Sequence, residues 1–174
     1  MEKTSYFRTF CKYTSLNVLG MLALSCYILA DTFFVSQRMG ANGLAALNLA
    51  VPVYNFLNGT GLMLGMGAAT HYSIAKSQGN DREADRYFTH AVALVCGFTA
   101  LYVVLGLFFP GPIVRLFGAS GEVYGMSETY LQTLLLFSPA FLLNNTLLCF
   151  VRNDGAPQLS MAGMITGSLS NVVL

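Results

Sequence analysis

Long stretches without charged side chains constrain the fold of this chain more than any other feature. None of Asp, Glu, Lys or Arg occurs at residues 39–75, 87–114, 129–151 and 155–174. Each run is near or above the roughly 20 residues that an α-helix needs to cross the hydrocarbon core of a bilayer. A soluble domain carries about 25% charged residues, whereas this chain of 174 residues carries 10%. The runs therefore predict an all-α integral membrane protein.

A fifth apolar segment lies near the N-terminus and contains one carboxylate. Residues 13–30 carry no charged side chain, and a further uncharged stretch separates Asp31 from Arg38. A carboxylate at the centre of a membrane helix costs about 3 kcal/mol or more, so such a residue usually marks an ion or substrate pathway. We therefore predict that Asp31 binds a proton or a small cation. The alternative is a carboxylate near a helix end that reaches interfacial water.

Turn-forming residues divide the chain into five expected membrane helices. Gly- and Pro-rich links occur at residues 39–43, 79–80, 110–112 and 154–157 and are typical of helix boundaries. Residues 1–12 alternate charged and aromatic side chains, which predicts an amphipathic lead-in on the membrane surface. Because the last apolar segment has no polar flank, we expect it to be part of a longer protein. The expected helices cover about residues 12–38, 44–76, 86–109, 123–151 and 157–174.

The positive charges are distributed unequally between the links. If the N-terminus is cytoplasmic, five alternating spans leave only Arg38 and Arg115 on the outer side. Cytoplasmic loops carry an excess of Lys and Arg, so the pattern predicts a multi-pass protein of the cell membrane with a cytoplasmic N-terminus. The seven cytoplasmic residues would be Lys3, Arg8, Lys12, Lys76, Arg82, Arg86 and Arg152.

Amide side chains recur inside the second and fourth predicted helices. Asn48, Asn55 and Asn58 fall within about 80° of arc at 100° per residue. In the fourth helix, Asn144 is followed by Asn145 and Thr146. Amides are costly against lipid, so we expect these side chains to contact other helices or to line a cavity. The candidate cavity-lining residues are Asn48, Asn55, Asn58 and Asn144.

Prolines and paired glycines indicate how these helices bend and pack. Pro52 lies in the second predicted helix, which is longer than one bilayer crossing, and Pro139 lies in the middle of the fourth. We expect both prolines to act as hinges, because proline removes a hydrogen bond from a helix. The spacing Gly61-x-x-x-Gly65 allows two helices to approach closely.

Motifs for catalysis and metal binding are missing from the sequence. It contains no phosphate-binding loop, nucleophile elbow, His-Glu-x-x-His motif or cysteine pair, which are the usual signs of such chemistry. His71 and His90 are not spaced as metal ligands, and the net charge of +1 includes no basic cluster for nucleic acid. We therefore expect no enzymatic activity, no metal site and no cofactor apart from a coupling ion.

Four segments carry a family resemblance: Asp31-Thr-Phe-Phe-Val, Gly43-Leu-Ala-Ala-Leu with Pro52 and the glycines that follow, Gly79-Asn-Asp-Arg-Glu-Ala, and Phe150-Val-Arg-Asn-Asp-Gly-Ala-Pro157. Together they resemble the N-terminal part of a multidrug and toxic compound extrusion (MATE) transporter. The resemblance covers nearly the whole chain and implies twelve helices in two six-helix lobes, around a central cavity that opens alternately to each side. It also implies export of cationic or aromatic compounds, coupled to the entry of H⁺ or Na⁺.

The resemblance also implies roles for particular residues. Asp31 corresponds to the first-helix acid implicated in cation coupling, and Asn171 to a fifth-helix amide that lines the same pocket. The first helix lacks the proline at which some family members bend. Five helices are less than half of such a transporter, so the chain alone is expected to be inactive. Its expected partners are the remaining helices, the lipid bilayer and small-molecule drugs or toxic organic cations.

Two other functions remain open at this point. One is a lipid-linked precursor flippase of the same superfamily, which a large cationic cavity would favour. The other is a membrane assembly subunit without transport activity, in which Asp31 would have a structural partner. Either H⁺ or Na⁺ can bind a single carboxylate, so both coupling ions remain open as well.

Overall fold

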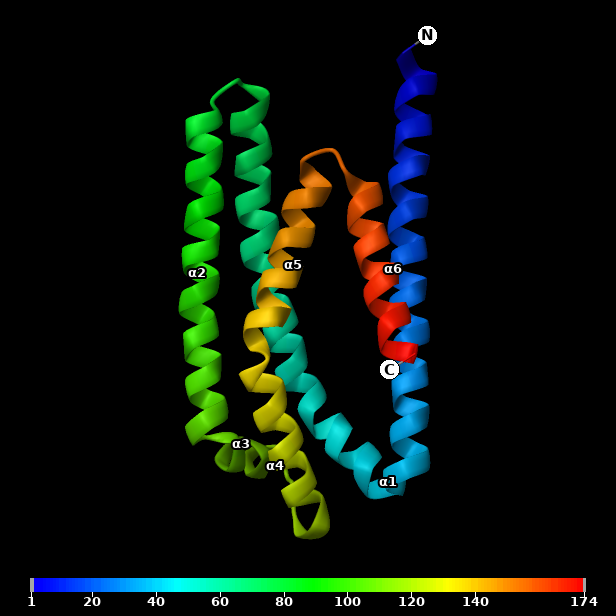
Figure 1. Cartoon of the computed structure of the whole chain (residues 1–174), viewed down its shortest axis with the longest axis vertical. Helices are drawn as coiled ribbons and strands as arrows, with labels where there is room; N and C mark the ends of the chain where they lie inside the picture. Colours follow the sequence, from blue (N-terminus) through cyan, green and yellow to red (C-terminus); the bar gives the residue numbers. More distant parts are fainter. Residues whose placement is uncertain (1, 174) are drawn as a thin grey trace. The chain divides into compact units, whose positions relative to one another are not determined.

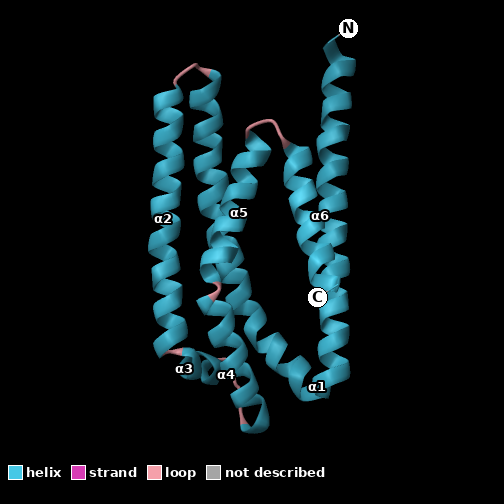
Figure 2. Cartoon of the chain, in the orientation of Figure 1, coloured by secondary structure: helices cyan, strands magenta, loops and turns pink. Residues whose placement is uncertain are grey.

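The computed structural model describes the backbone of residues 2–173, and among these residues it contains helices and no strand (Figure 1, Figure 2). Side chains are described except at residues 2–6, 9, 12–13, 16–17, 24, 27, 31, 157, 168–169 and 171–173. This confirms the prediction of an all-α chain. The helices are α1 (Glu2–Ser77), α2 (Asp81–Phe108), α3 (Pro110–Leu116), α4 (Gly121–Leu136), α5 (Ser138–Asn153) and α6 (Pro157–Val173).

α1 consists of two helical segments that meet at a sharp break. Gly40 has φ 62° and ψ −151°, a backbone conformation that is essentially restricted to glycine. A Cβ atom on Gly43 would collide with the side chain of Met39, so the turn requires both glycines. An unbroken helix of 76 residues would extend over about 110 Å, several times the roughly 30 Å of the hydrocarbon core. The break therefore makes two membrane crossings possible.

The segment predicted as one helix over residues 123–151 is instead a bent pair. α4 ends at Leu136, α5 begins at Ser138, and their axes differ by 49°. The physical reason is that Pro139 has no N–H for the carbonyl four residues earlier. The N–H of Ala140 bonds to the Phe137 carbonyl at 3.0 Å, which tightens the turn. Pro52, the other expected hinge, lies in α1 at a point where the backbone keeps helical torsion angles.

Two further boundaries differ from the sequence-based expectation. Residues 2–12 continue directly into α1 in place of a separate surface helix, because no glycine or proline interrupts them. Between α2 and α4, where we expected only a stop and a turn, Pro110 begins the short helix α3. Proline is well suited to this first position, because its missing N–H has no helical partner there.

Tertiary contacts divide the chain into two units, which we describe separately. The smaller unit comprises residues 1–34 and 151–174, and the larger unit comprises residues 35–150. In the smaller unit, a Cβ atom on Gly20 of α1 would lie 3.4 Å from the Met164 sulfur of α6. The larger unit packs the second segment of α1 (residues 41–77) with α2, α4 and α5. Its main buried cluster includes Leu57, Val95, Leu131, Leu135 and Leu142.

Several helices are long and apolar enough to cross a membrane. Among the described residues these are Val18–Ser77 of α1 and the whole of α2, and the bent pair α4–α5 adds a third if it forms one span. Because α1 breaks at Gly40, its apolar part contains two segments of crossing length. α6 has 17 residues, at the lower limit for a membrane helix.

Candidate functional site

A pair of amides joins α1 to α5 inside the larger unit. Asn145 donates from Nδ2 to Oδ1 of Asn58 at 2.6 Å, and both side chains are partly buried. The adjacent hydroxyl of Thr146 donates to the Gly61 carbonyl at 3.3 Å and is buried. Hydrogen bonds of this kind keep polar groups of neighbouring membrane helices away from lipid. Asn58 thus contacts another helix.

Two glycines make these hydrogen bonds possible by bringing the helix backbones together. A Cβ atom on Gly61 would lie 3.0 Å from Cβ of Asn145, and one on Gly65 would lie 2.9 Å from Cα of Thr146. These are shorter than ordinary van der Waals contacts, so no larger residue fits without moving α5. The glycine spacing and the polar contacts therefore fix the same register between α1 and α5.

The polar contacts extend from α1 to α2 through a tyrosine. Thr60 donates its hydroxyl to the Phe56 carbonyl at 2.8 Å, and the same oxygen lies 2.8 Å from the Tyr102 hydroxyl. A threonine hydroxyl has one proton, so Tyr102 acts as the donor in the second bond. We call Asn58, Thr60, Tyr102, Asn145 and Thr146 the polar junction. It links α1, α2 and α5 within their apolar surroundings.

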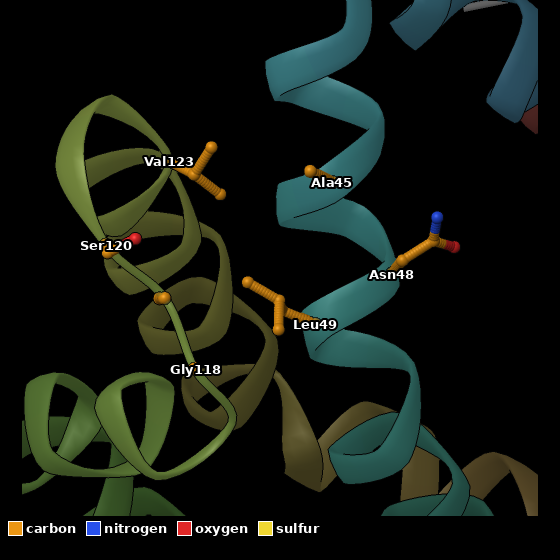
Figure 3. A pocket seen from close by; sticks show the side chains of 7 residues that line it. Ala45, Asn48, Leu49, Gly118, Ser120 and Val123 are labelled. Carbon is orange, nitrogen blue, oxygen red and sulfur yellow. The ribbon is translucent and has the colours of Figure 1, made fainter.

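The other predicted amides lie away from the polar junction. Asn48, Asn55 and Asn144 are exposed within the larger unit. Asn48 borders a shallow hollow of about 430 Å³ between α1 and the start of α4. Figure 3 shows the Asn48 side chain pointing away from Ser120 and Val123, which lie on the opposite side of the hollow. These three amides are thus available for other contacts, and the structure does not bring them together with Asn58.

The polar junction contains residues that sequence analysis did not single out as site residues. Asn145 was noted only together with Asn144, although Leu142, Asn145, Thr146 and Cys149 follow the spacing of one helix face. That spacing could have identified Asn145 as the inward amide. Tyr102 lies in an apolar run without a distinguishing pattern.

The two predicted cation-coupling residues belong to the smaller unit. Asp31 lies on α1 and Asn171 on α6, and the side chains of both are outside the described residues. The nearby hydroxyls of Ser25 and Thr32 donate to carbonyls of their own helix, at 3.0 and 2.8 Å. Among the described residues, no group of three or more His, Cys, Asp or Glu could hold a metal ion.

The amide pair predicts unequal effects for two neighbouring substitutions. Asn145→Leu should lower the free energy of unfolding by about 1 to 2 kcal/mol, because it leaves Asn58 without its partner. Asn144→Leu makes the same chemical change at an exposed position and should alter stability by less than about 0.5 kcal/mol. Unfolding of the purified protein in mixed micelles, followed by circular dichroism, measures both. Equal effects of the two substitutions would contradict the assignment of Asn145 as the bonded amide.

Comparison with known proteins identifies the family. A family model described as MatE matches residues 17–174. The chain belongs to the MatE family. This confirms the resemblance to MATE transporters that the sequence motifs indicate.

Relatives and solved structures show how much of a MATE protein this chain represents. Multidrug export proteins MepA from Staphylococcus saprophyticus and from Staphylococcus aureus are each 26% identical to it over 175 residues, which is 99% of this chain and 38% of theirs. A crystal structure described as MATE in complex with MaD3S is 27% identical, with a TM-score of 0.83 over 90% of this chain and 35% of that one. The chain therefore spans about 38% of the length of the curated relatives.

A second solved structure carries a different functional description. It is a MOP superfamily transporter from Pyrococcus furiosus, whose binding pocket of reverse polarity is said to suggest a different function. It is 27% identical to this chain, with a TM-score of 0.83 over 90% of this chain and 34% of that one. That transporter thus shares the fold of this chain.

Proposed function

We propose that this chain is the N-terminal part of a secondary active multidrug exporter in the cell membrane. The exporter would exchange cationic or aromatic compounds for H⁺ or Na⁺ by alternating access, with the chain's N-terminus in the cytoplasm. Relatives that match 99% of the chain are named multidrug export proteins. Since the match covers 38% of their length, the other helices of the transporter would complete both lobes.

The helix register in the smaller unit carries this proposal. The first segment of α1 and α6 run in the same direction (Figure 1), and Gly20 approaches Met164. Position 31 is eleven residues beyond Gly20, and position 171 is seven beyond Met164. At 100° per residue, each lies within about 20° of the face that makes the contact. At 1.5 Å per residue, the two positions differ by about 6 Å along the helices.

This register supports a shared cation site for a carboxylate and an amide. The carboxylate of Asp31 can take up a proton or bind a monovalent cation, and the amide oxygen of Asn171 can supply a second ligand. Occupancy changes the charge at the contact between α1 and α6, so it favours one packing of the helices over another. Transport follows if the compound binds better to the conformation that the cation disfavours. The exposed amides Asn48 and Asn55 are candidate contacts for the compound.

Ethidium efflux with each ion gradient collapsed separately tests the proposal. Cells that express the whole protein should lose ethidium faster than cells that lack it. An ionophore that removes the coupling gradient should return the rate to that of the control cells, because the exchange then has no driving force. Collapse of the other gradient should have little effect. Efflux that survives loss of both gradients, or no efflux at all, would reject coupled export and favour the flippase.

A further inference from the structure

The short helix α3 follows the C-terminal end of α2, which is long enough to span a membrane. α2 contains 28 residues and therefore extends about 42 Å, which exceeds the roughly 30 Å of the hydrocarbon core. Its last turn thus reaches the headgroup region when α2 crosses the bilayer. α3 begins two residues later and runs across the end of α2, beside α4 (Figure 1). This position is at the level of the membrane surface.

One side of α3 is held firmly against the larger unit. Val114 is 2% exposed and belongs to the main buried cluster. Pro110 and Gly111 are also buried, and a Cβ atom on Gly111 would lie 2.6 Å from the Tyr124 hydroxyl of α4. α3 is therefore a fixed element with a defined outer side.

α3, the link before it and the end of α2 expose large apolar side chains and a single cation. Leu116 is 83% exposed, and Phe108 and Phe109 are 70% and 49% exposed. Arg115 is exposed, and its guanidinium carbon lies 5.1 Å from the centre of the Tyr124 ring. Residues 108–118 contain no acidic side chain. The opposite end of α2 differs, because its hairpin at residues 77–83 is polar and exposed.

From this arrangement we propose that α3 is an interfacial anchor that binds the lipid headgroup region. Phe108, Phe109 and Leu116 insert among the upper acyl chains, as the apolar faces of interfacial helices do. Arg115 binds an anionic lipid phosphate. Its guanidinium lies over the Tyr124 ring, and a guanidinium can donate N–H groups in pairs to a phosphate. The inference depends on α2 being a membrane span and does not depend on the transport reaction.

Tryptophan fluorescence tests the anchor directly, because the chain contains no tryptophan. The protein with Leu116→Trp is reconstituted into vesicles of phosphatidylcholine and phosphatidylglycerol that carry bromine either near the headgroup or near the chain ends. Bromine near the headgroup should quench the fluorescence of the introduced indole about twofold more than bromine near the chain ends, which corresponds to insertion of about 5 to 10 Å. Leu116 is mostly exposed, so the substitution disturbs no packing.

Two matched tryptophan variants give reference values for quenching in the hydrocarbon core and in water. Leu94→Trp reports on an exposed position in the middle of α2 and should be quenched more by bromine near the chain ends. Gln78→Trp reports on the polar hairpin and should be quenched by neither lipid. If Leu116→Trp behaves like Gln78→Trp or like Leu94→Trp, α3 is not an interfacial anchor.

The role of Arg115 is tested in the same protein. Brominated phosphatidylglycerol should quench Leu116→Trp about twofold more than brominated phosphatidylcholine, if the guanidinium selects anionic headgroups. Adding Arg115→Gln should remove this preference, while the dependence on bromine depth persists. Equal quenching by the two lipids with Arg115 present would overturn its assignment as a headgroup ligand.

Discussion

Replacement of Asp31 by Asn is expected to abolish ethidium efflux while the protein still inserts into the membrane. The amide has almost the same size as the carboxylate, so helix packing is conserved. However, an amide neither takes up a proton nor supplies the charge that holds a monovalent cation. The carboxylate is preceded by residues 13–30 without any charged side chain, so no nearby acid on this helix can replace it. The efflux rate should fall to that of cells that lack the protein.

The control for this substitution is the same chemical change on the polar hairpin. Asp85 is an exposed carboxylate near the start of α2, and Asp85→Asn should leave efflux unchanged. The amount of each variant in the membrane fraction is measured in parallel, so that poor insertion is not mistaken for lost coupling. Full efflux by Asp31→Asn would remove Asp31 from the coupling mechanism, and lost efflux by Asp85→Asn would show that the effect is not specific to the intramembrane carboxylate.

The helical fold could be predicted because membrane crossing imposes a simple length requirement. The run at residues 39–75 lies in α1, and the run at residues 87–114 covers most of α2 and continues into α3. Apolar length alone determines whether a helix can span the core. The spacing of Gly61 and Gly65 indicated a close helix contact, and α5 makes that contact. In both cases the pattern that supports the prediction lies within a single stretch of the sequence.

Features that depend on a partner helix could not be predicted in the same way. The hydroxyl of Tyr102 finds Thr60 on another helix, and nothing in the apolar run around Tyr102 indicates which helix lies beside it. The bend between α4 and α5, in contrast, lies at Pro139, where the sequence predicted a hinge, because the missing N–H of proline acts within its own helix. The side chains of Asp31 and Asn171 lie outside the described residues, so their pairing stays a prediction.

The contact between α1 and α5 gives the second large expected effect. A Cβ atom on Gly65 would lie 2.9 Å from Cα of Thr146 and 3.0 Å from the Cys149 sulfur. The nearest atom belongs to the backbone, so a rotamer change cannot relieve the collision. Gly65→Leu should therefore lower the free energy of unfolding by about 3 kcal/mol or more, at the upper end of the usual cost of overpacking. A Cβ atom on Gly67 would meet nothing within 4 Å beyond its chain neighbours and the nearby backbone of its own helix, so Gly67→Leu should not destabilise the protein.

The buried thiol of Cys149 reports on this contact independently of stability. Cys11, Cys26 and Cys96 are exposed, whereas Cys149 is buried, so replacing the first three by Ala leaves one informative thiol. Gly65→Leu should push α5 away from α1 and increase the rate at which a maleimide modifies Cys149. Gly67→Leu should leave that rate unchanged, although both substitutions add the same side chain and the same gain in helix propensity. Slow modification in both variants, with equal unfolding free energies, would show that α5 does not pack on α1 at Gly65.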